Sequence, residues 1–478
     1  MHIVLSQILN RDEPDQKMFP ALGLGYLAAF ASERMDGLEF KYAETADEIL
    51  AAQPDVVGIS SVSENFDGAR LLVSQIREVF DGPLILGGIH ISTSPGSLPR
   101  ECDVGVIGEG ELTFLELIRA IAADRRRWKD SLGSIPGLCY WSNDKLRLTP
   151  EREQVGDLDT LPYPDESVLG KGWATLEGGT QYVVTSRGCP YDCSFCSSAH
   201  FWHRVRYFSA EYVLGQLSRI IEKSSPRAII FGDDLLIANK ERLSAIASGI
   251  ESSGIADDVS FLCNVRSNHV DKELCSTLKR MNVSGVALGL ESGSDRVLGL
   301  MNKRTSVAQH ENALRELHEA GMNVYTSFIL GTPGETIEDI KLTVDFIERN
   351  QRVHFDFDIY PLIPYPGTRF WDYAVGKGLI DESVSSEVFQ VGALTFTPDK
   401  YLYLNEKVPR ETFLHYFFYL KYLAYRNMAH RRGEEIGAYQ SAEKSYKEII
   451  RIRDIEKEHL ELLVASLKSQ DNNRRLGS

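Results

Sequence analysis

Residues 185–202 read TSRGCPYDCSFCSSAHFW and place Cys189, Cys193 and Cys196 in one short loop. In a reducing compartment, clustered cysteines serve metal binding or catalysis more often than structural disulfides. Three thiolates can hold three irons of a cubane cluster and leave the fourth iron without a protein ligand. His200, shortly after the third cysteine, leaves open a closed Cys3His zinc site. The loop therefore predicts an iron–sulfur site, with zinc or a disulfide as alternatives.

The chain after this loop alternates short apolar runs with amphipathic segments, which is typical of parallel strands joined by crossover helices. The expected strands are 181–187, 227–233, 259–265, 285–291, 324–330 and 355–363. The expected helices between them include 211–223, 240–253, 306–320 and 336–349. Six such units predict an open (β/α)6 TIM-like barrel over residues 179–375 that carries its working residues on the loops after the strands.

The first third of the chain has the same α/β alternation. Five short strands are expected at 2–8, 38–42, 55–60, 83–88 and 103–108. They predict a flavodoxin-like (Rossmann-type) domain over residues 1–135, with its ligand beyond the carboxyl ends of the strands. The candidate ligand-binding residues at those ends are Ser60, Ser61, Gly87, Gly88, Gly108 and Glu109. Glycines there would let a bulky planar ligand approach the backbone, although tight turns alone could also explain them.

Three further segments complete the organisation. The stretch 23–28 loosely matches a dinucleotide fingerprint, but it lies too far past the first strand and is interpreted as the start of a helix.

Residues 136–178 are expected to form a linker that contains a hairpin, 138–148, turning at Asn143 and Asp144. Residues 376–478 are mainly helical, and one face carries Phe413, Tyr416, Phe417, Leu420, Leu423 and Ala424. That stripe could face the core or form a wall beside the substrate.

The composition favours a protein that handles a small molecule. Among 478 residues the formal charge is −16, whereas proteins that bind nucleic acid concentrate basic charge. The N-terminal residues do not resemble a secretory signal, and no apolar run reaches the roughly 20 residues of a membrane span. We therefore expect a cytoplasmic protein without a membrane span. The scattered Cys102, Cys139, Cys263 and Cys275 are expected to be packing residues.

The cysteine loop, with Phe195 before its third cysteine, resembles that of the radical S-adenosylmethionine (SAM) superfamily. The resemblance implies that Cys189, Cys193 and Cys196 bind a [4Fe-4S] cluster and that the open iron chelates SAM. It also implies reductive cleavage of SAM to a 5'-deoxyadenosyl radical, and therefore an electron donor such as flavodoxin or ferredoxin. By the same resemblance, Phe195 lies beside the adenine.

Later segments match the superfamily in order and imply further SAM-binding residues. "FGDD" supplies Gly232, Asp233 and Asp234 for the methionine ammonium, and a carboxylate suits a cation. Arg266 is a candidate for the SAM carboxylate, and Glu291 with Ser292 for the ribose. "GTPGET" supplies Gly331 and Thr332, whose backbone could face the adenosine.

The two halves together, with "ILGGIHISTSPG", "VIGEGE" and "MNKRTS", resemble the cobalamin-binding branch of the superfamily over residues 1–375. Its best-known members are methyltransferases, in which one SAM methylates cobalamin and a second yields the radical that activates the substrate. The loop after the first strand, ILNRDEPDQKMFP, has no histidine to ligate cobalt. His90 is interpreted as a residue that caps a turn, and a domain that has lost cobalamin stays an alternative.

The sequence thus predicts a radical SAM enzyme, most simply a cobalamin-dependent methyltransferase acting on a small metabolite or natural-product intermediate. The main alternative is an enzyme of the same architecture that dehydrates, epimerises, rearranges or couples its substrate. A tRNA methylthiotransferase would need a second cluster, whereas the first domain holds only Cys102. A zinc-binding module without catalytic activity is the remaining alternative.

Overall fold

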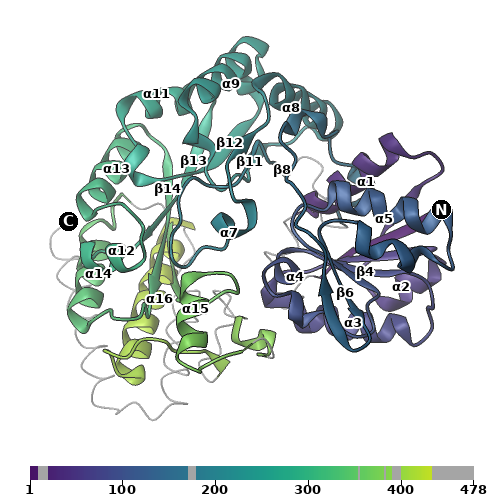
Figure 1. Cartoon of the computed structure of the whole chain (residues 1–478). Coiled ribbons are helices and arrows are strands. Elements are labelled where there is room, and N and C mark those ends of the chain that lie inside the picture. The colour runs from purple at the N-terminus through teal and green to yellow at the C-terminus, as the bar shows by residue number, and fades with distance from the viewer. Residues whose placement is uncertain (9–19, 171–178, 354–355, 382–383, 390–399, 433–478) are drawn as a thin grey trace.

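The computed structural model describes all residues except 9–19, 171–178, 354–355, 382–383, 390–399 and 433–478. Two large sheets lie side by side, one of seven strands and one of six (Figure 1). The loop with the three cysteines and the short helix α7 (Ser198–Trp202) lie between them. The predicted α/β class is confirmed.

The first sheet has the order expected of a flavodoxin-like fold. Its parallel strands run in the order β2 (Glu39–Tyr42), β1 (His2–Gln7), β3 (Val56–Ser60), β4 (Leu84–Gly87) and β5 (Val104–Val106). Its helices are α1 (Leu22–Arg34), α2 (Ala46–Ala51), α3 (Phe66–Arg77), α4 (Ile89–Thr93) and α5 (Glu111–Ala123). Residues 23–28 lie in α1, as expected.

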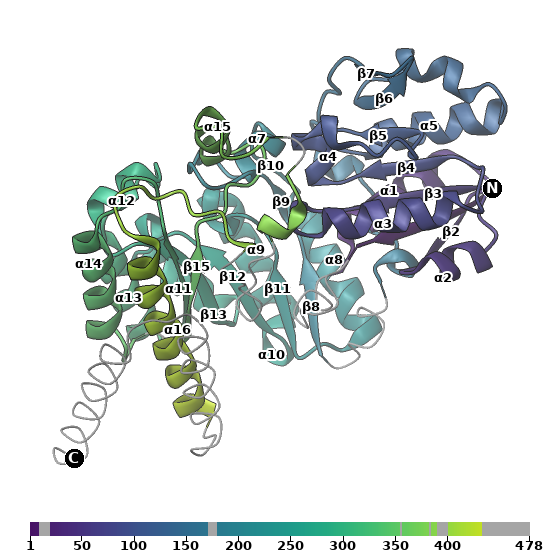
Figure 2. The same cartoon turned by 90° about the horizontal axis from the view of Figure 1, so that it is seen from below.

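The predicted hairpin exists, but it extends the first sheet instead of standing apart in the linker. Strands β6 (Leu138–Ser142) and β7 (Lys145–Leu148) pair antiparallel beyond β5 (Figure 2). Asn143 and Asp144 both have positive φ, as a two-residue hairpin turn requires. The hairpin covers what would otherwise be an open sheet edge at β5.

The second sheet is entirely parallel and has the predicted six strands. They run in the order β8 (Thr180–Val183), β11 (Ala228–Phe231), β12 (Ser260–Val265), β13 (Val283–Glu291), β14 (Asn323–Leu330) and β15 (Asp356–Pro361). Its main helices are α8 (Ala210–Ser224), α9 (Lys240–Ser253), α11 (Lys272–Arg280), α13 (Val307–Glu319) and α14 (Ile337–Arg349). Side-chain caps fix several helix starts; Ser306 forms a capping box at α13.

Shorter elements complete this half of the molecule. They are β9 (Ser186–Arg187), β10 (Arg206–Tyr207), α10 (Ile255–Asp258), α12 (Asp295–Leu300), α15 (Arg369–Gly376) and α16 (Arg410–Arg432). Helix α16 packs along β15, at the open edge of the partial barrel. Its predicted apolar stripe is largely buried: Phe413, Phe417, Leu420, Leu423 and Ala424 are at most 6% exposed.

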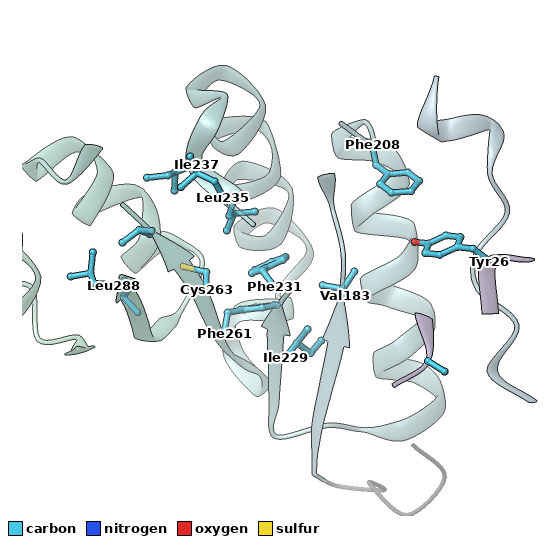
Figure 3. Packing of buried hydrophobic residues seen from close by; sticks show 14 of the residues in the cluster. Tyr26, Val183, Phe208, Ile229, Phe231, Leu235, Ile237, Phe261, Cys263 and Leu288 are labelled. Carbon is cyan, nitrogen blue, oxygen red and sulfur yellow. The ribbon is translucent and has the colours of Figure 1, made fainter. Parts of the chain in front are cut away.

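The apolar core continues from the barrel into the first domain (Figure 3). Tyr26 of α1 stacks on Phe208, with ring centroids 6.1 Å apart, and Phe208 stacks on Tyr212 of α8 at 4.3 Å. Buried aromatic pairs contribute both area and directional packing. The two domains therefore share one core at this point.

A buried ion-pair cluster lies beside this shared core. Arg187 and Arg206 face each other on the antiparallel pair β9–β10, which forms the stem of the cysteine loop. Arg187 donates to Glu109 at 2.7 Å and to Glu111 at 2.6 Å, and Arg206 donates to Glu109 at 2.8 Å. Burial alone would raise the pKa of Glu109, but the Arg206 hydrogen bond and the Arg187 charge hold it below its ordinary value.

The domains also meet on a second side. Tyr365, after β15, donates a hydrogen bond to the Glu64 carboxylate, and Ser386 donates from its backbone N–H to Asp67 of α3 at 2.8 Å. These contacts and the ion-pair cluster hold the first domain against the rest of the chain at two separate places. Over the portion of the chain described, no helix is both long and apolar enough to cross a bilayer.

We predict that Glu109→Gln lowers the free energy of unfolding by about 3 kcal/mol, because it leaves two buried guanidinium groups incompletely paired. Glu116→Gln is the matched control. It breaks an ion pair with Arg152 in which the glutamate is 39% exposed, and it should lower the free energy by less than about 1 kcal/mol. Denaturant unfolding measures both changes; equal effects would contradict a special role for the buried cluster.

Candidate functional site

A cavity of about 780 Å³ lies inside the partial barrel and reaches the carboxyl ends of its strands. Cys189, Cys193 and Cys196 line it together. Four of the predicted SAM-binding residues line it as well: Phe195, Asp234, Arg266 and Glu291. Its volume lies toward the upper end of the range for small-molecule sites, so it can accommodate a cofactor and a substrate together.

Hydrogen bonds to residues 301 and 302 hold the cysteine loop, and His200 does not complete a Cys3His site with the three cysteines. Ser194 donates its N–H to the Met301 carbonyl at 2.8 Å, and Asn302 donates to the Asp192 carbonyl at 3.0 Å. His200 is exposed and lines a different cavity. Within the described ranges, no three His, Cys, Asp or Glu side chains converge as a single ion would require. A cluster places each thiolate on a different iron, so its ligands stand apart.

Arg266 offers donors to the cavity. Its Nη1 lies 3.6 Å from the Cys193 Sγ, and its guanidinium lies 3.7 Å from the centroid of the Tyr191 ring. Nε and Nη2 are buried and have no hydrogen-bond partner among the residues that the structure places. A buried donor left without a partner is costly, so these nitrogens fit an anionic ligand group such as a carboxylate.

Asp234 offers the opposite charge. It accepts a hydrogen bond from Ser198 at 2.6 Å, and burial raises its pKa above the ordinary value. None of the described cations forms an ion pair with it. A carboxylate that lines the cavity without a counter-charge fits an ammonium group. With Arg266, it makes the cavity complementary to an amino-acid zwitterion, the terminal part of SAM.

The other residues of the FGDD segment do not reach the cavity wall. Asp233 is fully buried and accepts hydrogen bonds from the Thr185 N–H and hydroxyl, both at 3.0 Å. It therefore ties the end of β8 to the end of β11. Gly232 is also absent from the wall.

Glu291 lines the cavity as one half of a buried ion pair. Lys303 donates to its carboxylate at 2.7 Å, and the Lys303 Nζ lies 5.6 Å from the Phe195 ring centroid. Glu291 has a φ of 66°, a conformation that non-glycine residues adopt mainly where the surroundings enforce it. Lys303 was not predicted as a site residue, although the segment MNKRTS contains it. Ser292 bonds Thr343 instead and does not line the cavity.

Gly331 and Thr332 also lie away from this cavity, because the C-terminal part of the chain covers them. Asn405 donates to the carbonyls of Thr332 and Glu335, both at 2.9 Å, and a Cβ on Gly331 would lie 2.9 Å from the Tyr401 hydroxyl. Gly331 donates its N–H to the Glu335 carboxyl at 2.7 Å. Burial raises the pKa of Glu335 to about 8.

A second cavity, of about 170 Å³, lies at the carboxyl edge of the first sheet. Among the predicted cobalamin-binding residues, it brings together Ser60, Gly87, Gly88, Gly108 and Glu109. The Glu109 carboxylate is paired with Arg187 and Arg206, so the Glu109 backbone is the part that can contact a ligand. Ser61 does not line the wall, and its N–H bonds the Gly87 carbonyl at 3.1 Å.

The glycines of this second cavity fit a flat ligand. A Cβ on Gly23 or Gly108 would meet no protein atom within 4 Å, so a side chain there would extend into open space. Leu5, Leu24 and Leu27 add apolar surface to the wall. This combination of bare backbone and apolar side chains suits part of a corrin or its nucleotide tail.

His90 does not line that cavity. It is buried in α4, its Nδ1 lies 3.0 Å from the Ser63 hydroxyl, and its ring stacks on Phe66 at 3.9 Å. Burial lowers the pKa of His90 to about 4, so the ring is neutral at physiological pH. It is thus a packing residue of this helix. Most of the loop after β1, residues 9–19, lies outside the described residues.

We predict that Cys193→Ala abolishes the brown colour and the bound iron and sulfide of anaerobically reconstituted protein. Cys263→Ala should retain both, because Cys263 is a buried thiol on β12 outside the loop. Iron and sulfide analysis and the visible spectrum measure this. Retention of a full cluster by Cys193→Ala, or bound zinc in place of iron in the wild type, would contradict the cluster assignment.

We predict that Glu335→Gln flattens the pH dependence of thermal stability. The native state keeps the Glu335 proton up to pH about 8, whereas the unfolded chain releases it near its ordinary pKa of about 4.3. The contribution of this group is therefore complete below about pH 4 and is lost as the pH rises through about 8. The melting temperature of the wild type should fall more across this window than that of the variant. Glu338→Gln, at an exposed position of α14, should keep the wild-type slope.

Comparisons with known proteins agree with this geometry. Residues 183–347 match the radical SAM superfamily, and residues 16–118 match the B12 binding domain. A protein of Pyrococcus horikoshii described as an uncharacterized methyltransferase is 33% identical over 374 residues, which span 76% of this chain and 80% of that protein. The cytidylyl-2-hydroxyethylphosphonate methyltransferase of Streptomyces wedmorensis is 24% identical over 443 residues, 80% of this chain and 82% of that protein.

A solved structure shares the fold. The radical S-adenosylmethionine methyltransferase TsrM from Kitasatospora setae, solved with cobalamin and a [4Fe-4S] cluster, superposes with a TM-score of 0.65 at 18% identity. The match covers 79% of this chain and 75% of TsrM. The chain therefore belongs to the radical SAM superfamily, in the branch with a B12-binding domain, and is a cobalamin-dependent radical SAM enzyme that uses a [4Fe-4S] cluster, SAM and cobalamin.

Proposed function

We propose that this enzyme transfers a methyl group to a small metabolite or natural-product intermediate. The observation that carries the proposal is that one segment, 187–202, contributes walls to both cavities. Cys189, Cys193 and Cys196 face the larger cavity, whereas Arg187 and Trp202 line the smaller one. A ligand in each cavity would therefore lie against the same loop.

The residues of this chain would hold and orient the two cofactors. Asp234 and Arg266 would take the ammonium and carboxylate of SAM, and the Glu291–Lys303 pair with Phe195 would lie along its nucleoside. The glycine-lined cavity would take part of the corrin. When bound, SAM at the cluster supplies a 5'-deoxyadenosyl radical, and cobalamin supplies the methyl group. A one-electron donor such as flavodoxin or ferredoxin is part of this proposal.

The named relatives support methylation over other radical outcomes. The Pyrococcus relative, the Streptomyces relative and TsrM all carry the word methyltransferase in their descriptions. The Streptomyces enzyme acts, by its name, on a cytidylyl phosphonate, which is a small molecule. Non-methylating radical chemistry on the same architecture is the competing outcome of the test below.

The test is anaerobic reconstitution with and without hydroxocobalamin, followed by analysis of the products formed from SAM under reducing conditions. Methyl transfer predicts S-adenosylhomocysteine together with 5'-deoxyadenosine and a bound corrin spectrum. 5'-Deoxyadenosine without S-adenosylhomocysteine or corrin would show a non-methylating enzyme and overturn the proposal.

We predict that Gly23→Leu prevents corrin loading while the protein stays folded. The leucine would extend into the smaller cavity, and leucine favours a helix over glycine by about 1 kcal/mol, so α1 should not be weakened. Gly299→Leu, in α12, is the matched control, because a Cβ there also meets no atom within 4 Å. The corrin absorbance of the purified proteins measures loading; normal loading of Gly23→Leu would place the corrin elsewhere.

A further inference from the structure

Arg266 is held by a residue of the cysteine loop that does not itself reach the larger cavity. Tyr191 lies between Cys189 and Cys193 in the sequence and is absent from the cavity wall. The Arg266 guanidinium lies over its ring, 3.7 Å from the centroid. An arginine over an aromatic face gains cation–π attraction without using its hydrogen-bond donors. Tyr191 can therefore fix the guanidinium without competing for the hydrogen bonds that a ligand would make.

Tyr191 is in turn anchored to the turn that follows Arg266. Its hydroxyl lies 2.7 Å from the His269 Nε2 and accepts a hydrogen bond from the Asn268 side-chain amide at 2.9 Å. Both partners belong to the 3-10 turn Ser267–His269, which Arg266 directly precedes. Burial and the Arg266 charge lower the pKa of His269, so its ring is neutral and Nε2 can accept from the hydroxyl.

These contacts form a closed path around Arg266. The path runs from the Arg266 backbone along the turn to the Tyr191 hydroxyl, and from the Tyr191 ring back to the guanidinium. An unrestrained arginine populates many rotamers, and ordering it when a ligand binds costs free energy. The path restricts this freedom before a ligand arrives. It thereby keeps Nε and Nη2, which have no partner within the described ranges, oriented for a carboxylate.

The same guanidinium also lies against one of the cluster cysteines. Its Nη1 is 3.6 Å from the Cys193 Sγ, and Tyr191 is two residues from both Cys189 and Cys193. The loop that supplies the thiolates therefore also supplies the ring that orients Arg266. This arrangement fixes the distance between the cluster position and the donors assigned to the SAM carboxylate.

We propose that Tyr191 is a positioning residue that holds Arg266 in the orientation that binds the SAM carboxylate, and that it raises the affinity for SAM only through Arg266. The inference rests on the proposed function, because it takes Arg266 as the partner of that carboxylate. Asn268 and His269 would anchor the tyrosine.

Calorimetric binding of SAM and of decarboxylated SAM tests this on the holoenzyme, reconstituted with the cluster and hydroxocobalamin and kept without reductant. Tyr191→Leu should weaken SAM binding about tenfold and change the affinity for decarboxylated SAM by less than about twofold. Arg266→Ala should weaken SAM binding at least as much. In the Arg266→Ala background, Tyr191→Leu should cause no further loss, because residues that act through one another are not additive.

Tyr163→Leu is the matched control. Tyr163 also has an arginine over its ring, Arg219 at 5.9 Å, and a hydrogen-bonded hydroxyl, but it lines neither cavity. The variant should keep the wild-type affinity for both ligands. Tyr191→Phe keeps the ring and removes both hydrogen bonds, so it decides the question if Tyr191→Leu loses its iron and sulfide. It should weaken SAM binding about threefold and leave decarboxylated SAM unaffected.

Unchanged SAM affinity in Tyr191 variants that retain the cluster would overturn the proposal, as would equal weakening of both ligands or an additive loss in the double variant. Normal SAM binding by Arg266→Ala would refute the assignment of Arg266 and this inference with it. A loss in Arg266→Ala without one in the Tyr191 variants would refute this inference alone. A coupled loss in an enzyme that forms no S-adenosylhomocysteine would refute methylation and support the role of Tyr191.

Discussion

The position of the Glu109 carboxylate between two arginines is the constraint on which the rest of the site depends. Arg187 and Arg206 flank the cysteine loop, because they face each other on the short strands that enter and leave it. Glu109 lies in the turn after β5 of the other domain, and Glu111 is the first residue of α5. One buried cluster therefore fixes the loop that lines the larger cavity to the sheet edge that lines the smaller one. Tyr26 and Phe208 extend the same junction with apolar contact.

Different elements of the chain line the different parts of the two cavities. The cysteine loop and the ends of β11, β12 and β13 present charges of both signs to the larger cavity, and the first sheet presents bare backbone and apolar side chains to the smaller one. The last two strands present acids and tyrosines, and α16 adds Ala424 beside them. These three groups of residues come from different strands and helices. Each can therefore have its own charge and polarity within one folded chain.

Much of the fold could be predicted from the sequence, because eleven predicted strands correspond to strong local patterns that burial preserves. The residues of the site could be predicted less completely from the sequence. Asp234 and Arg266 follow their strands directly and reach the cavity, whereas Gly331 and Thr332 do the same but are covered by the segment around Asn405. No local pattern indicates that a distant segment will cover a loop. Lys303 was missed for a similar reason, since its acidic partner Glu291 lies on another element.

The location of α16 has an evolutionary consequence. This helix follows the last barrel strand by about fifty residues and packs against β15, so a change at a cavity-facing position such as Ala424 would alter the cavity without touching the cysteine loop. A lineage could exchange or reshape this one helix and acquire a new substrate while its radical chemistry persisted unchanged. Divergence among such enzymes should therefore be concentrated downstream of β15, where selection can act on specificity separately from catalysis.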